Sequence, residues 1–284
     1  MFACNPGAEE AARLRDDCEA GDATACNGFA LRLLRGERVL RDEPRAGGLF
    51  ERACEAGVAE GCAQLGDMHL NAIGVDRDST RATDLYRRAC EGGAMEGCAS
   101  LGILYREGGP VEPDLVRATD LFQRACDGGH AVGCYHLGAL YASNEDAGED
   151  RARAAGLFQR ACDGGALAGC VALGRLYAAG GGVTGDNARA RDLYQKACDG
   201  DTAAGCFRLG ELYATGEGVA QDFERAADLY RDACYDRHAE ACYSLGMLRL
   251  NGSGAVRDPG QASYWIRRAC RLGYREACPD ERES

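Results

Sequence analysis

The sequence predicts an all-α protein in which pairs of helices stack as a solenoid. Cysteines recur in pairs eight residues apart, and each pair follows the last by 36 residues without a slip. A fixed period of about 20–50 residues is typical of a repeat array rather than of separate globular domains. Between the pairs, apolar residues return at the spacing of one helix face. The paired cysteines are Cys18 and Cys26, Cys54 and Cys62, Cys90 and Cys98, Cys126 and Cys134, Cys162 and Cys170, Cys198 and Cys206, Cys234 and Cys242, and Cys270 and Cys278.

A first helix is predicted after the second cysteine of each pair. After Cys134, for example, Leu137, Gly138, Leu140 and Tyr141 fall on one helical face. Glycine inside a helix costs about 1 kcal/mol relative to alanine, so its regular return needs a reason. Close approach of a neighbouring helix is a better reason than catalysis. The recurring glycines are Gly66, Gly102, Gly138, Gly174, Gly210 and Gly246.

A second helix is predicted to start at an aspartate that stands 16 residues after the second cysteine. Its short carboxylate suits the free amide groups and the positive dipole end of a helix start. Metal binding is the alternative, but neighbouring repeats lie about 10 Å apart, too far to share an ion. We therefore expect seven helix caps, at Asp42, Asp78, Asp114, Asp150, Asp186, Asp222 and Asp258.

The cysteine spacing tests this arrangement. In one continuous helix, residues eight apart are separated by about 12 Å, beyond the limit of about 7 Å between the Cα atoms of a disulfide. A tight turn between them would bring the sulfurs together and join each second helix to the next first helix. Glycines three residues after most first cysteines mark such a turn, whereas Asp201 and Arg237 depart from that rule. A zinc site is disfavoured because the sequence has no closely spaced cysteine pair to gather four thiolates.

Composition limits the classes of function. The net charge of −12 argues against a nucleic-acid partner. No apolar run reaches 18 residues, so no transmembrane segment is expected. Seventeen cysteines favour an oxidising compartment, although no export signal is visible. Cys4 follows a small residue, as in a bacterial lipoprotein, and is a candidate lipid anchor; a free thiol in a frayed segment is the alternative.

The repeated phrases A-x-x-L-Y/F-x-x-A-C and G-C-x-x-L-G-x-L-Y, at a period of 36, resemble Sel-one-like repeats. The cysteine spacing is similar to that of the Helicobacter cysteine-rich proteins and their bacterial relatives. The resemblance covers nearly the whole chain. It implies a right-handed α-solenoid with disulfides inside repeats, used as a secreted or periplasmic interaction scaffold. Some relatives bind penicillin-type compounds and carry a β-lactamase label, and a mitochondrial oxidase-assembly factor shares such repeats.

No catalytic motif supports an enzyme. Serine β-lactamases need S-x-x-K, but the only lysine, Lys196, has Leu193 three residues before it. The histidines His69, His130, His136 and His238 are scattered among repeats, so we expect surface or packing roles rather than metal ligation, and we expect no cofactor. Weak β-lactam binding or hydrolysis remains the alternative function, and a reduced cytosolic scaffold remains a third.

If the protein is a binding scaffold, we expect residues that vary from repeat to repeat on one face, among neighbours that stay the same. By analogy with tetratricopeptide repeats, the residues one and five places after the second cysteine should face a concave groove that binds a protein or peptide. Aromatic side chains gather at the first position in the C-terminal half. The predicted groove residues are Tyr135, Arg175, Phe207, Glu211, Tyr243 and Met247.

The chain is thus predicted to hold seven complete helix pairs, from residue 24 to 270, with a half unit at each end. Residues 1–6 are expected to be a flexible N-terminus, residues 7–278 the solenoid, and residues 279–284 a polar tail. Residues 143–149 lack the loop glycines of other repeats and form the least regular connection.

Overall fold

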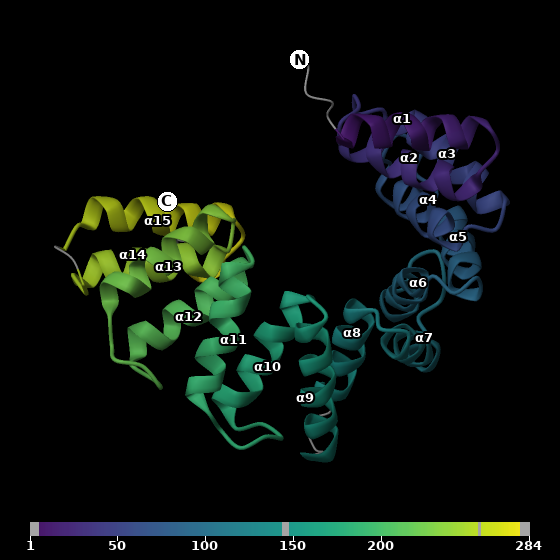
Figure 1. The fold of residues 1–284 in the computed structure, drawn as a ribbon. Coiled ribbons are helices and arrows are strands. Elements are labelled where there is room, and N and C mark those ends of the chain that lie inside the picture. The colour runs from purple at the N-terminus through teal and green to yellow at the C-terminus, as the bar shows by residue number, and fades with distance from the viewer. Residues whose placement is uncertain (1–5, 144–147, 255–256, 279–284) are drawn as a thin grey trace. The chain divides into compact units, whose positions relative to one another are not determined.

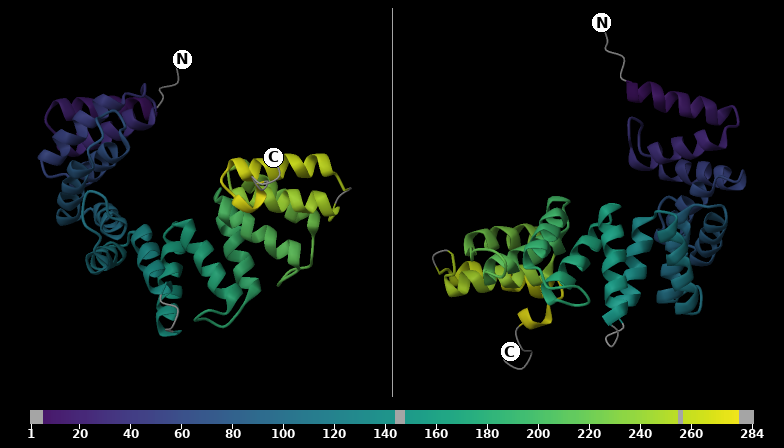
Figure 2. Two further views of the ribbon diagram at one scale, coloured as in Figure 1. Left: turned by 180° about the vertical axis from the view of Figure 1, so that it is seen from behind. Right: turned by 60° about the horizontal axis from the view of Figure 1, so that its bottom comes forward.

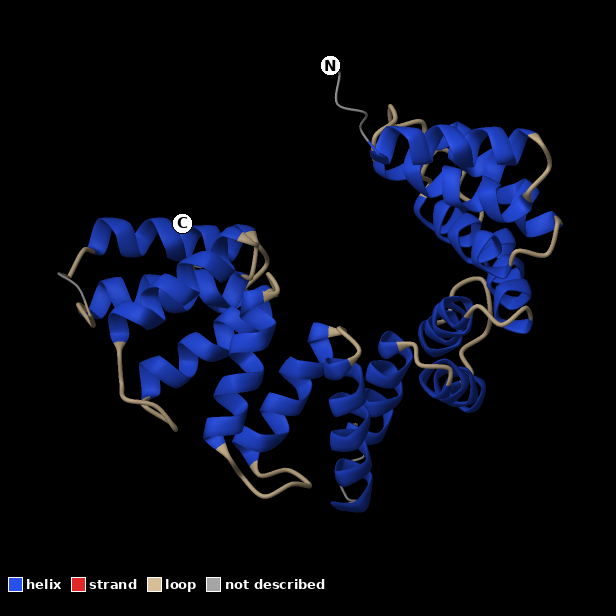
Figure 3. Cartoon of the chain, in the orientation of Figure 1, coloured by secondary structure: helices blue, strands red, loops and turns tan. Residues whose placement is uncertain are grey.

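The structure, a computed structural model, describes residues 6–143, 148–254 and 257–278. Within these residues all regular structure is helical, and no strand occurs (Figure 3). Fifteen α-helices and one 3₁₀ helix follow one another along this described part of the chain (Figure 1). None of these helices is both long enough and apolar enough to cross a membrane. The predicted all-α fold is confirmed, whereas Cys4, residues 144–147 and the tail from residue 279 lie outside the described residues.

The chain divides into two compact units, Met1–Leu137 and Gly138–Ser284, and the division falls within α8 (Ala131–Ala142). The first unit contains α1 (Pro6–Glu19), α2 (Ala23–Arg35), α3 (Glu43–Glu55), α4 (Ala59–Asn71), α5 (Ser79–Glu91), α6 (Met95–Glu107) and α7 (Leu115–Asp127). The second contains α9 (Gly148–Asp163), α10 (Leu167–Ala179), α11 (Asn187–Asp199), α12 (Ala203–Thr215), α13 (Phe223–Tyr235), α14 (Ala239–Asn251), α15 (Pro259–Arg271) and η1 (Arg275–Ala277).

Within each unit, consecutive helices pack side by side. This holds from α1 to α7 and from α9 to α15, and the views of Figure 2 show the same succession. The even-numbered helices are the predicted first helices, and the odd-numbered helices from α3 onward are the second helices. The pairs α2–α3 to α14–α15 are the seven predicted repeats.

Every predicted cysteine pair forms a disulfide across a chain reversal. The Cα atoms of the eight pairs lie 4.5–4.9 Å apart. Gly57, for example, has φ +90° in the turn between α3 and α4, a conformation that glycine adopts without strain. At the two exceptions, Asp201 and Arg237 take the left-handed conformation themselves, with φ +58° and +67°. The bonds join helices that a straight chain would keep apart.

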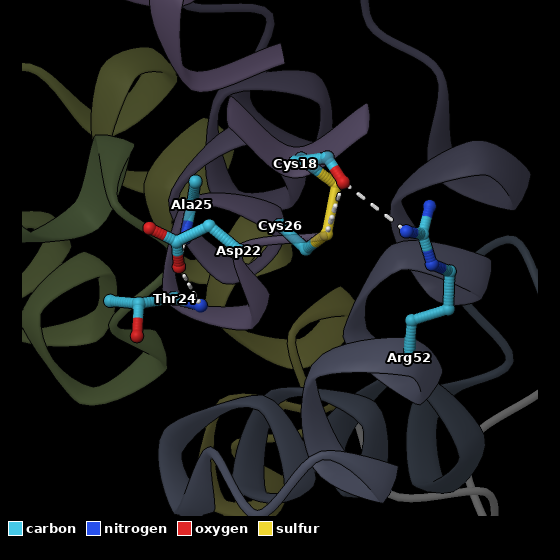
Figure 4. Close-up of a disulfide and its surroundings, with 6 residues drawn as sticks. All are labelled: Cys18, Asp22, Thr24, Ala25, Cys26 and Arg52. Atoms are coloured by element: carbon cyan, nitrogen blue, oxygen red, sulfur yellow. Dashed lines mark hydrogen bonds between the residues drawn. A yellow bond between two sulfur atoms is a disulfide. The ribbon is translucent and has the colours of Figure 1, made fainter. Parts of the chain in front are cut away.

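Six of the seven expected aspartate caps are present. Asp42, for example, accepts a hydrogen bond from the backbone N–H of Arg45 at 3.1 Å. The same bond recurs at Asp78, Asp114, Asp186, Asp222 and Asp258. Asp150 is the exception, because α9 begins at Gly148 and places this residue in its first turn. Asp22 is an unpredicted cap that lies inside the first disulfide interval and accepts from Thr24 and Ala25 (Figure 4).

A basic side chain links consecutive repeats. The Arg52 guanidinium donates to the carbonyl oxygen of Cys18 at 3.2 Å, from α3 to the end of α1 (Figure 4). The equivalent bonds run from Arg88 to Cys54, Arg124 to Cys90, Lys196 to Cys162, and Arg268 to Cys234. Lys196, the lysine considered for catalysis, therefore has a structural partner. Asp232 occupies the equivalent position in α13.

Candidate functional site

The first helices carry both sets of predicted groove residues. At the first position, the side chains of Tyr135 and Tyr243 are half-buried. The Tyr135 ring lies 5.1 Å from that of His136, and the Tyr243 ring lies 5.1 Å from that of Tyr274. At the fifth position, Arg175 is exposed, whereas Glu211 and Met247 are half-buried. Five of the six predicted residues thus retain some access to solvent.

Phe207 does not lie where a groove anchor was expected. Its side chain is only 1 % exposed. The ring stacks on His238 at 4.6 Å between centroids and tilts against Tyr230 at 5.7 Å. Tyr230 of the same repeat and His238 at the start of the next therefore cover Phe207, which belongs to the core of the second unit.

The fifth position is supported by close packing between the two helices of its repeat. A methyl group added at Gly174 would lie 2.5 Å from Cε1 of Tyr194, so α10 tolerates only glycine against this ring. Tyr86 packs on Gly66, and Phe122 on Gly102, in the same way. Close approach was the predicted reason for these glycines and is confirmed. In the pair of Gly66 and Tyr86, the hydroxyl at the end of the ring reaches Asp67, the residue that follows the glycine.

One hollow of about 380 Å³ opens at this level in the second unit. Arg175 of α10, Tyr194 of α11, and Arg208 and Glu211 of α12 line it. The remaining lining residues are Ala178, Ala179, Leu212, Thr215 and Glu217. The hollow brings together two predicted groove residues, Arg175 and Glu211, with seven that were not predicted, among them Tyr194 and Arg208.

The charges in the hollow are only partly paired. Arg208 Nη1 lies 2.6 Å from Glu211 Oε2. Among the residues that the structure describes, none forms a hydrogen bond or ion pair with the Arg175 guanidinium or the Tyr194 hydroxyl. Burial raises the pKa of Tyr194 to about 12, against the opposing effect of both arginines. Burial also raises the pKa of Glu211, with Arg208 acting in the opposite direction.

At the equivalent position of the first unit, the tyrosine hydroxyl has a partner. There Tyr86 donates from its hydroxyl to Asp67 Oδ1 at 2.6 Å. Burial raises the pKa of Asp67, while the Tyr86 hydrogen bond lowers it. Gln64 donates to Glu96 at 3.1 Å. The residue over the tyrosine is thus acidic here, whereas it is the basic Arg175 at the hollow of α10 to α12, where two arginines face two glutamates.

Tyr194 was missed as a site residue, although the sequence carries a signal for it. In every repeat where the fifth position is charged, the ring beneath it is tyrosine. Where the fifth position is apolar, the residue beneath it is phenylalanine or isoleucine. The pairs are Leu31–Phe50, Asp67–Tyr86, Ile103–Phe122, Ala139–Phe158, Arg175–Tyr194, Glu211–Tyr230 and Met247–Ile266.

The family description Sel1 repeat matches seven consecutive stretches, residues 23–58, 59–93, 96–130, 131–165, 167–201, 203–238 and 239–274. The chain belongs to the Sel1 repeat family. Repeats of this family generally serve protein interaction rather than catalysis. No curated protein matches the sequence.

Solved Sel1 structures resemble the chain over most of its length. A protective antigen of uropathogenic Escherichia coli with an SLR fold is 26 % identical, with TM-score 0.73, over 94 % of this chain and 57 % of that one. The chain thus spans little more than half of the antigen. A Sel1 repeat protein from Oxalobacter formigenes is 20 % identical, with TM-score 0.75, over 86 % and 96 % of the two chains, and shows the shared fold. Helicobacter pylori cysteine rich protein B is 29 % identical over 46 % of this chain and 94 % of its own, with TM-score 0.39.

Three of the four histidines in these Sel1 repeats have partners for their side chains within the protein, and that of His238 is the Phe207 ring described above. His136 stacks on Phe122 at 5.1 Å, and its Nδ1 lies 2.8 Å from Arg106 Nη1. Burial and the Arg106 charge lower the pKa of His136 to about 4. His69 Nδ1 lies 3.0 Å from the carbonyl oxygen of Asp76. Within the described residues, no cluster of histidine, cysteine and carboxylate side chains is suited to a metal ion.

A second kind of hollow lies between consecutive second helices. One, of about 470 Å³, is lined by Arg87 of α5, Tyr105 of α6, and Val116 and Arg117 of α7, among others. A hollow one repeat earlier uses the equivalent positions, including Glu51 and Arg81, which form an ion pair. Arg117 is engaged by Asp114 and by the Tyr105 ring. These side chains are occupied with one another, unlike those around Tyr194.

Proposed function

We propose that this Sel1 repeat chain is a non-catalytic scaffold that holds a peptide or protein segment against the first helices. The observation that carries the proposal is the fifth position, where acidic, basic and apolar residues all occur, although six of the seven repeats keep the glycine before it and six keep the aromatic ring beneath it. Packing fixes the glycine and the ring but leaves the fifth residue free to vary. Such residues are available to recognise a partner.

The surroundings of the fifth position favour this role. The hollow beside Arg175 is open and lined by both charged and apolar groups, as small recognition pockets are. In the same unit, Tyr243 adds a half-buried aromatic ring at the first position of α14, and such rings are common anchors at interfaces. Met247 adds an adaptable apolar contact. Together they suit an extended segment with mixed side chains.

The disulfides indicate an oxidising environment. We place the scaffold outside the cytoplasm, secreted or in a bacterial periplasm. Cys4 remains the candidate lipid anchor and lies outside the described residues. In such a compartment the disulfides stabilise the scaffold, because each one limits the unfolding of one helical hairpin.

Selection from a random peptide library against the oxidised full chain tests the proposal. We expect enriched peptides whose affinity falls by about tenfold when Arg175, Glu211, Tyr243 or Met247 is changed singly to alanine, which corresponds to about 1.4 kcal/mol. Arg153→Ala in α9 and Arg191→Ala in α11 are matched controls, because both arginines pair with a neighbouring carboxylate outside the hollow.

Two results would contradict the proposal. In the first, the library yields no binders, or binders that respond only to changes between the second helices, such as Val116→Ala. In the second, purified protein hydrolyses the chromogenic β-lactam nitrocefin, which would support the β-lactamase alternative instead.

A further inference from the structure

Packing does not explain the Tyr194 hydroxyl, because phenylalanine fills the equivalent position in other repeats. The Tyr194 side chain is 3 % exposed, and its ring fills the same space over Gly174 that Phe122 fills over Gly102. Phenylalanine would pack equally well and would avoid the desolvation of a hydroxyl group. In the first unit, the equivalent hydroxyl of Tyr86 is satisfied by Asp67. At Tyr194 the corresponding residue is Arg175, which offers donors only.

The donors at this hollow are not all paired. Arg175, Arg208 and the Tyr194 hydroxyl present donors, whereas Glu211 and Glu217 are the carboxylates of the lining, and Arg208 already engages Glu211. The charge of Glu217 acts on Glu211 and raises its pKa. An acceptor about the size of a carboxylate would satisfy the donors of Arg175 and Tyr194 that have no partner among the described residues.

We propose that the hollow between α10, α11 and α12 binds the side-chain carboxylate of an aspartate or glutamate in the partner segment. The Arg175 guanidinium supplies the unpaired charge, the Tyr194 hydroxyl donates one hydrogen bond, and Arg208 completes the donor set. A carboxylate suits this arrangement because a guanidinium binds it with two parallel N–H donors. The inference deepens the proposed function and rests on it: it specifies the chemistry of one partner residue.

The test uses the oxidised full chain and a library of random nonapeptides whose C-termini are blocked by fusion. An acidic residue should be enriched at one fixed position on the wild type and lost from selections on Arg175→Ala. One enriched peptide is then synthesised with both ends blocked, and its affinity is measured by fluorescence anisotropy. Replacing its acidic residue by the matching amide should weaken binding to the wild type by about tenfold. The same replacement should have little effect on binding to Arg175→Ala.

Two variants distinguish a loss of peptide binding from a loss of folding. Tyr194→Phe keeps the ring and should reduce affinity for the acidic peptide by about fivefold, while binding of the amide peptide and the circular dichroism spectrum stay unchanged. Arg191→Ala removes an arginine from the same helix but outside the hollow, and should change neither affinity.

The outcomes distinguish the two proposals. Enriched peptides without an acidic preference, or with one that survives in Arg175→Ala, would overturn the carboxylate site and leave the scaffold function standing. Enrichment only in a parallel library with free C-termini would also overturn it, because the ligand would then be a terminal carboxylate. A complete lack of enrichment would overturn the proposed function and the site together.

Discussion

At the scale of single residues, tyrosine at one repeat position has different roles in the two units. Tyr86 donates to Asp67, a half-buried carboxylate. Tyr194 has no such partner and faces an open hollow. Changing tyrosine to phenylalanine should therefore lower the stability of the protein at residue 86. At residue 194 the same change should lower affinity for a partner and leave stability nearly unchanged.

We expect Tyr86→Phe to lower the free energy of unfolding by about 1.5 kcal/mol, because it removes a hydrogen bond to a partly buried charge. Tyr194→Phe should change that free energy by less than about 0.5 kcal/mol, since no described residue loses a partner. Urea unfolding followed by circular dichroism measures both. Native-state hydrogen exchange should locate the Tyr86→Phe effect in α4 and α5. Equal losses in the two variants would show that the hydroxyl at residue 194 has an internal partner.

At the scale of the elements, the turn between α13 and α14 carries identifiable strain. Arg237 adopts φ +67° where most other repeats have glycine. The left-handed conformation costs an L-residue about 1–2 kcal/mol, and the greater freedom of glycine in the unfolded chain offsets part of that difference. The turn persists because the backbone N–H of Arg237 bonds to Cys234, and the Cys234–Cys242 disulfide closes the hairpin.

Arg237→Gly should therefore raise the free energy of unfolding by about 0.5–1 kcal/mol. Asp201→Gly should give a smaller gain, because aspartate tolerates this conformation better than arginine does. Thermal unfolding of the oxidised protein measures the change. Asp236→Gly is the matched control: φ there is −81°, so glycine should bring no gain. A loss of stability in Arg237→Gly would mean that the arginine side chain makes a favourable contact that outweighs the strain.

Local features of these elements were predictable, whereas features that depend on neighbouring repeats were not. The disulfide turns and six aspartate caps follow from residues within a few positions of one another. Asp150 departs from the pattern because α9 begins at Gly148, next to residues outside the described part of the chain. Phe207 was expected in the groove, but its burial depends on Tyr230 of the second helix of its own repeat and on His238 at the start of the next repeat. The hollow around Tyr194 needs three helices, and spacing within one helix does not show Arg208 beside it.

At the scale of the whole molecule, the disulfides and the inter-repeat bonds act on different parts of the chain. Most of the disulfides join a second helix to the first helix that follows it. At the ends of the array, one disulfide joins α1 to α2, and another joins α15 to the end of η1. Each bond from Arg52 or its equivalents joins one repeat to the repeat before it. In an array where each repeat touches only its neighbours, stability is close to the sum of such local terms. Reduction should therefore weaken every repeat rather than one core.

The redox state gives the last prediction. Protein isolated from an oxidising compartment, then denatured without reductant, should react with a thiol reagent at no cysteine other than Cys4, because the other sixteen are paired, and Cys4 itself should react only if it carries no lipid. Mass spectrometry after alkylation counts the modified residues, and the reduced, denatured protein is the control in which the sixteen paired cysteines should also be modified. Each closed loop contributes about 2.5 kcal/mol in the chain-entropy model, so the reduced protein should also unfold at a lower urea concentration. Seventeen reactive thiols in the unreduced sample would instead favour the reduced cytosolic scaffold, and the sixteen buried or half-buried cysteines would then serve only as small apolar core residues.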